Sequence, residues 1–392
     1  MKDEGRRNVI GMGAVSFFAD VAGEMIAPIL PLYLTVTLGA PPIAVGLVDG
    51  SAELAASLFR AVGGWWSDRA GRRKPTVVLG YSLSALAKPA LALTASWPGV
   101  LFVRFLDRTG KGLRGTARDA LIASSVEKES WGRAFGLHRA MDTAGAVAGP
   151  LIGLWLMEGR GFSHRGVFVA ATVPAVLSIL VLFVFVRETR GGEPAAAPEP
   201  RPAAPRPPLT PEFWRFLAIY GLFAVGNSSD SFLLLKAKAS GLAEGQVILA
   251  YVLFNLVNAG LAPSIGARAD RVGRRRTVAA GFAVFALCYA GFAVAGPAAL
   301  WPLFALYGLH AALVEGSFRA VVSQFSDEAG RGTAHGVFQS AAGVLAFTAS
   351  VLAGALWTRI GPAAPFWFGA ICAALSSAAL FSAVPSAPRR RA

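Results

Sequence analysis

Apolar residues occur along this chain in long runs, and short polar stretches separate the runs. A helix needs about 20 apolar residues to cross the hydrocarbon core of a bilayer. The pattern therefore predicts an all-α polytopic membrane protein of about twelve transmembrane helices. The expected helices cover residues 9–36, 43–66, 76–96, 99–123, 134–157, 167–186, 213–235, 247–265, 278–295, 300–324, 334–357 and 365–384.

The first apolar run follows a basic start, as the apolar part of a secretory signal peptide does. However, this run continues past Leu30 and contains Asp20 and Glu24. It is therefore too long and too polar for a cleaved signal. We expect it to form the first spanning helix.

A stretch rich in Pro and Ala, residues 191–211, divides the apolar runs into two sets of six. It has no apolar periodicity, so we expect an extended linker on the cytoplasmic side. The expected organisation is an N-terminal six-helix bundle over 1–190, this linker, and a C-terminal six-helix bundle over 212–392 with a basic cytoplasmic tail.

The composition supports lipid as the solvent for much of the surface. Hydrophobic residues make up 54% of the chain and charged residues 15%, whereas a soluble domain has about 25% charged residues. The two cysteines lie singly within apolar runs, which predicts neither a disulfide framework nor a zinc site.

The formal net charge of +14 could indicate a nucleic-acid partner, but the positions of the charges favour a membrane topology. Basic clusters at 67–74, 270–276 and 389–391 fall on the same side as the basic N-terminus, and the opposite loops carry few charges. The exceptions are Arg160, Arg165, Lys236, Lys238 and Arg359. Because basic loops stay in the cytoplasm, we expect a bacterial inner-membrane protein with both termini cytoplasmic and no nucleic-acid partner.

The two halves repeat each other in sequence. Residues 64–73 read GWWSDRAGRR, and residues 266–275 read GARADRVGRR. Further on, GRAFG at 132–136 matches GTAHG at 332–336. Such a repeat predicts an internal duplication, and duplicated bundles of this kind build transporters that bind substrate between the halves.

The repeated loop G-x-x-x-D-R-x-G-R-R resembles the signature of the major facilitator superfamily, and the resemblance covers essentially the whole chain. Residues 145–153 read GAVAGPLIG and are similar to a helix-five motif associated with antiporters of that superfamily. The segment RFLDRTGKGLRGTARDALIA, 104–123, resembles a bacterial subgroup of unknown substrate. The corresponding stretch of the second half, 345–353, lacks the glycines and proline of the helix-five motif.

The resemblance implies that the signature loops hold the cytoplasmic side shut. Asp68 would cap a neighbouring helix and pair with a basic residue at the cytoplasmic end of the helix over 99–123. The alternative is that the loop charges only set topology. The expected gating residues are Asp68, Arg69, Gly71, Arg72, Arg114, Arg118, Asp270, Arg271, Gly273 and Arg274.

Ionisable side chains also recur within the apolar runs, where each is costly and therefore a functional candidate. Arg104, Asp107, Arg108, Lys111, Arg114 and Arg118 fall within an arc of roughly 120° on one helix. This stripe cannot face lipid, so it must line a polar cavity or pair with carboxylates of neighbouring helices.

We expect Asp20, Glu24, Glu53 and Asp142 to supply the carboxylates, with Arg104 and Arg108 pairing with some of them. Burial raises the pKa of such a carboxylate and a neighbouring arginine lowers it, so a switch between these two environments would couple protonation to conformation. The alternative is a fixed structural ion-pair network. In the second half, Asp230 and Glu315 are the binding candidates. Gly145, Gly149, Pro150 and Gly153 would allow close packing and a bend, either for antiport or as ordinary helix packing.

The sequence contains no P-loop, no nucleophile beside a base and no metal-ligand spacing. It therefore predicts a transporter rather than an enzyme, without a cofactor. We expect a monomeric secondary transporter that moves a small molecule by alternating access in the bilayer, as proton-coupled efflux. The alternatives are a proton symporter importing an organic anion or a chelated metal, and a membrane-embedded enzyme or lipid scramblase on the same scaffold.

Overall fold

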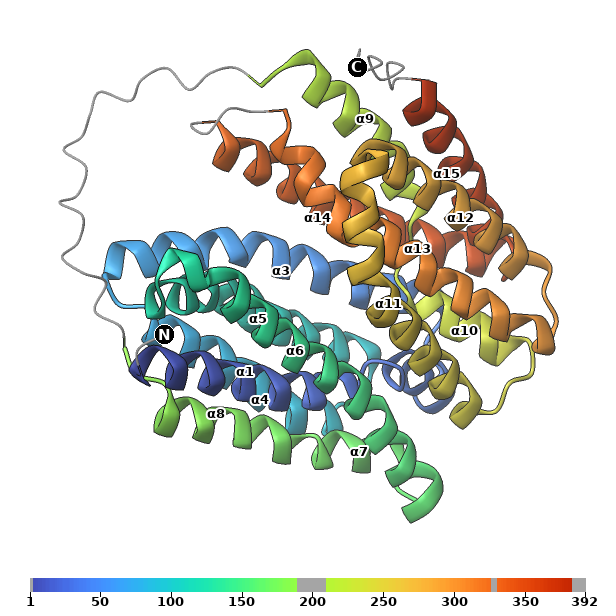
Figure 1. The fold of residues 1–392 in the computed structure, drawn as a ribbon. Coiled ribbons are helices and arrows are strands. Elements are labelled where there is room, and N and C mark those ends of the chain that lie inside the picture. The colour runs from blue at the N-terminus through green and yellow to red at the C-terminus, as the bar shows by residue number, and fades with distance from the viewer. Residues whose placement is uncertain (1–2, 189–208, 326–329, 383–392) are drawn as a thin grey trace, which may run out of the picture. The chain divides into compact units, whose positions relative to one another are not determined.

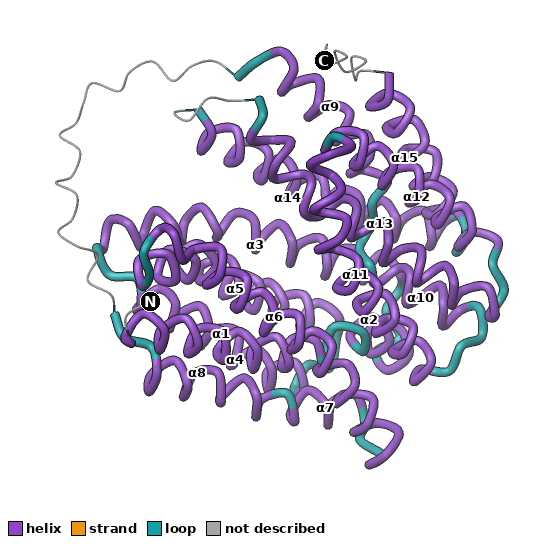
Figure 2. The backbone as a smooth tube through the Cα atoms, in the orientation of Figure 1, coloured by secondary structure: helices purple, strands orange, loops and turns teal. Residues whose placement is uncertain are grey.

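The computed structural model describes residues 3–188, 209–325 and 330–382, without the side chains of residues 3, 4, 68, 319 and 331. Most of the expected linker, the basic tail at 389–391 and the side chain of Asp68 therefore lie outside the described residues. Every regular element in the described ranges is a helix, and short loops connect the helices (Figure 2).

The described chain forms two compact units, the first comprising 3–188 with 243–252 and the second 209–242 with 253–382. The elements up to residue 188 are α1 (Asp3–Glu24), α2 (Leu30–Leu32), η1 (Tyr33–Thr37), α3 (Pro42–Ala70), α4 (Lys74–Ala92), α5 (Trp97–Ser125), η2 (Lys128–Ser130), α6 (Trp131–Leu154), η3 (Trp155–Gly159), α7 (His164–Ala170) and α8 (Thr172–Phe185). The later elements are α9 (Pro211–Gly226), α10 (Ser231–Ala239), α11 (Glu244–Val272), α12 (Arg274–Val294), α13 (Pro297–Ser323), α14 (Arg331–Arg359) and α15 (Ala364–Ser382).

Among the described residues, nine helical stretches are long and apolar enough to cross a membrane, by length and composition. They cover α3, α6, α7 with α8, α9 with α10, and each helix from α11 to α15. The three long helices outside this group are α1, α4 and α5, in which polar and charged residues interrupt the apolar sequence.

The helices of the first unit pack closely around α1 and α5. Helix α1 lies against α6 and α8, and α5 lies against both α3 and α4 (Figure 1). A Cβ atom on Gly112 of α5 would lie 2.7 Å from the carbonyl oxygen of Ala56 in α3, and one on Gly80 of α4 would lie 2.6 Å from the Cβ of Arg114. These glycines let the backbones approach, so α5 packs tightly against both α3 and α4.

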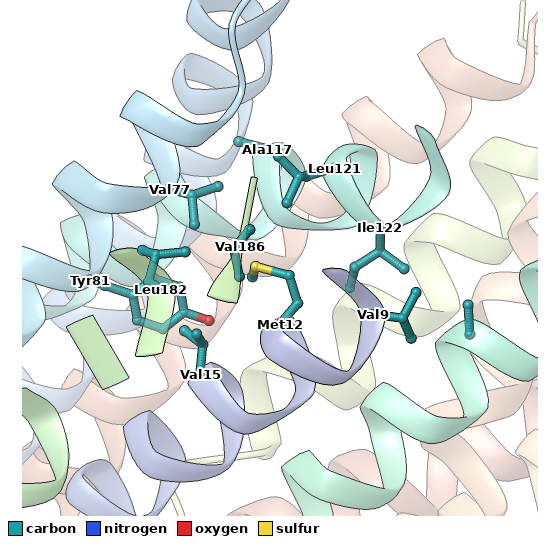
Figure 3. Packing of buried hydrophobic residues seen from close by; sticks show 11 residues of the cluster. Val9, Met12, Val15, Val77, Tyr81, Ala117, Leu121, Ile122, Leu182 and Val186 are labelled. Atoms are coloured by element: carbon teal, nitrogen blue, oxygen red, sulfur yellow. The ribbon is translucent and has the colours of Figure 1, made fainter. Parts of the chain in front are cut away.

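An apolar cluster fixes one end of this unit (Figure 3). Val9 and Met12 of α1 pack against Val77 of α4, Leu121 of α5 and Leu182 of α8, and all five are fully buried. The same end contains the loop between α3 and α4. The apolar cluster therefore ties α1, α4, α5 and α8 together beneath that loop.

Glu188 satisfies the first backbone N–H groups at the start of α4. The N–H of Arg73 donates to Oε1 at 3.1 Å, and the N–H of Lys74 donates to Oε2 at 3.0 Å. A carboxylate at a helix N-terminus also interacts favourably with the helix dipole. We had expected a capping role of this kind for Asp68 and not for Glu188.

Three helices expected to be continuous are interrupted, and the one over 167–186 is broken only at Ala171, between α7 and α8. The run over 9–36 leaves the α-helix after Glu24, because Pro28 has no N–H to donate to the Glu24 carbonyl and its ring disfavours an unbroken helix there. The run over 213–235 breaks at residues 227–229, between α9 and α10. There the Ser229 hydroxyl accepts a hydrogen bond from the N–H of Ser231 at 3.2 Å, a local bond that competes with helix continuation.

The internal repeat also appears in the contacts of each unit. In the first unit the Ser16 hydroxyl lies 3.2 Å from the Tyr81 hydroxyl, joining α1 to α4. In the second unit the Ser228 hydroxyl lies 3.2 Å from the Tyr289 hydroxyl, joining the segment after α9 to α12. In each unit, a contact between a serine and a tyrosine therefore joins the first span to the third.

Candidate functional site

The first unit contains a small polar cavity of about 40 Å³, lined by α1, α4, α5 and α8. A water molecule occupies roughly 10–15 Å³ on this measure, so the cavity has room for about three waters or one small polar group. The ionisable side chains that line it are Asp20, Glu24, Lys88, Arg104, Asp107, Arg108, Lys111 and Arg114.

The charged stripe of α5 lies along this cavity, from Arg104 to Arg114. Its centre is Asp107, whose two carboxylate oxygens contact different cations. Lys88 Nζ of α4 lies 3.2 Å from Oδ1, and Arg104 Nη1 lies 2.9 Å from Oδ2. All three side chains are almost fully buried, so the charges compensate one another inside the bundle.

This arrangement differs from the expected pairing in one respect. Arg108 contacts one of the four expected carboxylates, with Nη1 3.5 Å from Oε1 of Glu53. Arg104 instead pairs with Asp107 of its own helix. Lys88 was not among the expected site residues, although a lone lysine inside an apolar run is the kind of signal that marks a buried ion pair.

Arg114 links the cavity to a chain of polar contacts between helices. Its Nη1 donates to the Ser84 hydroxyl at 2.9 Å, and its guanidinium lies 4.2 Å from the centre of the Tyr81 ring. Ser16 contacts Tyr81, as described above, and also lies 2.8 Å from Nε2 of His138 in α6. Arg114 was placed with the gating residues by resemblance, and here it lines the cavity.

The carboxyl group of Asp20 in α1 faces that of Asp142 in α6. Asp142 Oδ2 also lies 3.7 Å from Arg139 Nη1, whereas Oδ1 is buried without a hydrogen-bond partner among the described residues. Two facing carboxylates repel each other unless one carries a proton, which then forms a hydrogen bond between them. This pair, called here the carboxyl pair, is thus a place where a proton would bind.

The glycines of the helix-five motif allow α6 to approach the acidic face of α1. A Cβ on Gly145 would lie 2.6 Å from the Phe17 carbonyl oxygen and 3.2 Å from the Asp20 Cβ. A Cβ on Gly149 would lie 2.8 Å from the Glu24 Cβ, and Gly153 lies against Met25. Only glycine fits at such distances, so the motif sets how close the carboxyl pair can come.

A second group of polar contacts in the first unit involves the start of α11. Nε2 of His164 lies 2.9 Å from Oε2 of Glu244, and Nδ1 of His164 lies 2.8 Å from the Thr37 hydroxyl. The Tyr251 hydroxyl donates to Oε2 of Glu24 at 2.8 Å. His164, Glu244 and Tyr251 were not identified from sequence, because a contact between helices far apart in the chain leaves no periodic signal.

In the second unit, Asp230 accepts a hydrogen bond from the Tyr307 hydroxyl at 2.6 Å. His310 is bound to the Gly281 carbonyl oxygen through Nδ1 at 2.8 Å. Glu315 lies exposed on α13. Phe223 and Phe285 surround the same region with aromatic contacts, so this unit is less charged and more aromatic than the first.

The repeated loops share one backbone feature. Gly71 has φ +61° and Gly273 has φ +102°, a region that side-chain-bearing residues rarely adopt. Asp270 and Arg274 form an ion pair across the second loop. Before the first loop, at the end of α3, the Arg69 guanidinium lies 5.7 Å from the centre of the Trp65 ring. The glycine repeated in the two motifs therefore has a conformational reason in both places.

No group of three or more metal-ligating side chains is arranged to hold a metal ion within the described residues. The site is thus composed of carboxylates, guanidinium groups, a buried ammonium group and hydroxyls. Such a set can exchange protons and bind charged groups by ion pairing.

Comparison with known proteins gives matches along the whole chain. The family model described as Major Facilitator Superfamily matches residues 12–341 and 231–392. An uncharacterized MFS-type transporter of Methanocaldococcus jannaschii is 33% identical, over 94% of this chain and 93% of the relative. The multi-drug resistance efflux pump PmrA of Streptococcus pneumoniae is 27% identical over 44% of this chain and 43% of that protein.

Solved structures show the same fold at low sequence identity. The nucleoside transporter NupG, in a mutant form, matches with a TM-score of 0.77 at 16% identity, over 95% of this chain and 98% of that one. A D-xylose-proton symporter matches with a TM-score of 0.73 at 16% identity, over 97% and 98% of the two chains. At these identities the likeness concerns the fold alone.

Proposed function

Because the chain belongs to the major facilitator superfamily, a family of multi-pass membrane transporters, we propose that it is a proton-coupled exporter of a small molecule working by alternating access. The observation that carries the proposal is the carboxyl pair, Asp20 and Asp142, beside a charged cavity within spanning helices. Membership of a transporter family sets aside the alternative of a membrane-embedded enzyme.

Protonation of the carboxyl pair would couple to helix movement through simple electrostatics. With one proton bound, the two carboxyl groups share a hydrogen bond and α1 stays against α6. When the proton leaves, two like charges face each other in a poorly solvated site and favour separation of the helices. Glu24 lines the same cavity as Asp20, one helical turn further along α1, so it is the next carboxylate to which a proton would transfer.

Export is favoured over import by two sequence features. The motif Gly145, Gly149, Pro150, Gly153 resembles the one associated with antiporters, and one relative over less than half of the chain is named as a multi-drug efflux pump. Symport of an organic anion or chelated metal would use the same site with the opposite direction of substrate flux. We place the protein in the bacterial inner membrane with both termini in the cytoplasm.

In the gating scheme, the repeated loops would hold the cytoplasmic side closed. The first loop would act through Asp68, Arg69 and Arg72, with Gly71 at its turn, and the second through Asp270, Arg271 and Arg274, with Gly273 at its turn. The positive φ of Gly71 and Gly273 supports this, since each loop needs a tight turn at that position. Arg114 and Arg118 would transmit loop movement to the cavity, because Arg118 donates to Ser16 at 3.4 Å and Arg114 lines the cavity.

The proposal is tested with purified protein in liposomes under an imposed proton gradient. Lumenal pH is followed while a panel of organic anions and amphipathic drugs is added. We expect Asp20→Asn and Asp142→Asn to abolish substrate-dependent proton movement and to retain substrate exchange at equal pH, because the amide cannot release a proton. Glu129→Gln, an exposed residue outside the cavity, is the matched control and should behave as wild type.

Three outcomes decide the matter. Loss of proton movement in both variants with exchange retained supports coupling at the carboxyl pair. Proton movement that persists in both variants would place the proton elsewhere. In export by antiport, protons and substrate cross the membrane in opposite directions. Protons that move in the same direction as the substrate would identify symport instead.

A further inference from the structure

We propose that the cavity of the first unit binds the anionic group of the transported molecule, a carboxylate, phosphate or sulfonate, through Arg104, Arg108 and Lys111. This inference rests on the proposed transport function, because it names the chemical class of the substrate. The observation that supports it is that some hydrogen-bond donors at the cavity have no acceptor in the protein.

Two guanidinium groups at the cavity have unused donors. Arg104 contacts Asp107 through Nη1, but its Nε is buried without an acceptor among the described residues. The Nε of Arg108 is also buried without an acceptor, and its Nη1 is 3.5 Å from Glu53. Buried donors nearly always have a partner, so these two call for an acceptor that the protein itself does not supply.

Lys111 adds a further positive charge on the same face of α5. It lies three residues after Arg108 and lines the same cavity. Within the described part of the chain it makes neither a salt bridge nor a hydrogen bond. Asp107 cannot serve it, since both of its oxygens already bind cations. Asp20 and Glu53 attract it electrostatically, but Asp20 faces Asp142 and Glu53 contacts Arg108.

These surplus donors select the class of ligand. A carboxylate, phosphate or sulfonate offers only acceptors and matches the two N–H groups on one edge of a guanidinium. An ammonium group would meet the like charge of these donors, and a neutral alcohol would leave that charge uncompensated. The volume of about 40 Å³ admits a small charged group in this conformation rather than a whole solute.

The excess of donors on α5 complements the excess of acceptors at the carboxyl pair. Asp142 Oδ1 lacks a donor, which a proton would supply, whereas Arg104 and Arg108 lack acceptors, which an anion would supply. Asp20 of this pair lines the cavity, so a proton on the pair and an anionic group on α5 would be held close together, which would favour coupling between them.

The test measures the charge selectivity of the cavity without measuring transport. A cysteine is introduced by Gly23→Cys, since Gly23 lines the cavity and a Cβ there meets nothing within 4 Å. Cys288 and Cys372, both buried in the second unit, are first replaced by alanine. The detergent-purified protein is reacted with methanethiosulfonate reagents that are alike except for an anionic sulfonate or a cationic trimethylammonium group, and each rate is divided by the rate with free cysteine.

We expect the normalised rate of the anionic reagent to exceed that of the cationic one about tenfold, because cationic side chains outnumber carboxylates in the cavity lining and give it a net positive field. Lys111→Gln and Arg108→Gln should each reduce this preference several-fold. Lys128→Gln, an exposed lysine outside the cavity, is the matched control and should leave it unchanged. A preference for the cationic reagent, or one that Lys111→Gln does not alter, would overturn the proposal.

A second arm separates two sources of the anionic group. Inorganic sulfate or phosphate should slow the reaction of neutral N-ethylmaleimide at Gly23→Cys if a soluble anion binds. Slowing in phosphatidylglycerol nanodiscs but not in phosphatidylcholine would identify a lipid headgroup as the source. Protection by none of them would refute anion binding. Proton coupling is measured separately in liposomes, so a failure of either proposal can be recognised by itself.

Discussion

Asp107 holds two cations inside the first unit, Lys88 through one carboxylate oxygen and Arg104 through the other. Removing one partner from a buried ion pair leaves an uncompensated charge in a poorly solvated place. The two partners are not equivalent here, because Asp107 keeps Arg104 when Lys88 is lost, whereas both cations lose their partner when Asp107 is lost. Substitution of Asp107 should therefore lower the free energy of unfolding more than substitution of Lys88.

We expect Asp107→Asn to lower the free energy of unfolding by about 3–5 kcal/mol. Lys88→Met should cost clearly less, since the Arg104–Asp107 pair survives and the methionine fills most of the lysine volume. The unfolding midpoints of the detergent-purified variants, measured by thermal unfolding, give the order of their stabilities. The exposed Asp119→Asn should stay within about 0.5 kcal/mol of wild type. Equal midpoints for Asp107→Asn and Asp119→Asn would contradict a compensated charge cluster.

At the scale of elements, α1 and α6 form the contact that carries the proposed proton site. Gly149 and Gly145 bring α6 so close to α1 that a methyl group would meet backbone atoms and the Cβ atoms of Glu24 and Asp20. Neither contact is the flexible end of a side chain, so the helices themselves would have to move apart. The separation of Asp20 and Asp142 would then increase.

Gly149→Ala should therefore lower stability by about 1–3 kcal/mol through overpacking and reduce proton-coupled transport. Gly136→Ala on the same helix is the matched control, because a Cβ there meets nothing within 4 Å, and alanine favours the helix by about 0.5–1 kcal/mol. Thermal unfolding and the liposome proton assay report the two effects. Normal proton coupling in Gly149→Ala would show that the α1–α6 distance does not set the site.

For the whole molecule, the two units share a design but differ in chemistry. Each joins its first and third spans through a serine–tyrosine contact. The first unit then fills its interior with ion pairs, whereas the second stacks aromatic rings, with Phe223 and Phe282 centred 3.9 Å apart. The duplicated halves have thus diverged, and the ionisable chemistry is concentrated in the first.

The proposed topology predicts which side each end of α6 faces. In protein without native cysteines, Lys128→Cys before α6 should react with a membrane-impermeant thiol reagent only from the cytoplasmic side. Phe162→Cys, beyond η3, should react only from outside. Both original side chains are exposed, so neither reporter requires the protein to open. Labelling of both cysteines from one side would contradict the orientation.

Several properties of this protein were determined by local sequence. Runs of apolar residues are visible along the chain because lipid solvates every spanning helix alike, so the all-helical membrane fold could be predicted. The spacing of Arg104, Arg108 and Lys111 likewise placed them on one face, because helical periodicity depends only on positions within one segment. The repeated loops indicated the superfamily, to which the comparisons confirm that the chain belongs.

Only the tertiary structure decided which partners these groups meet. Asp107 rather than a distant carboxylate binds Arg104, Lys88 joins the charge cluster from α4, and Glu188 bonds to the start of α4. The helix breaks near Pro28 and at Ser229 were also missed, although local residues explain them. A helical pattern fixes the face on which a side chain lies, but its partner depends on how closely the helices approach, which contacts between residues far apart in sequence set.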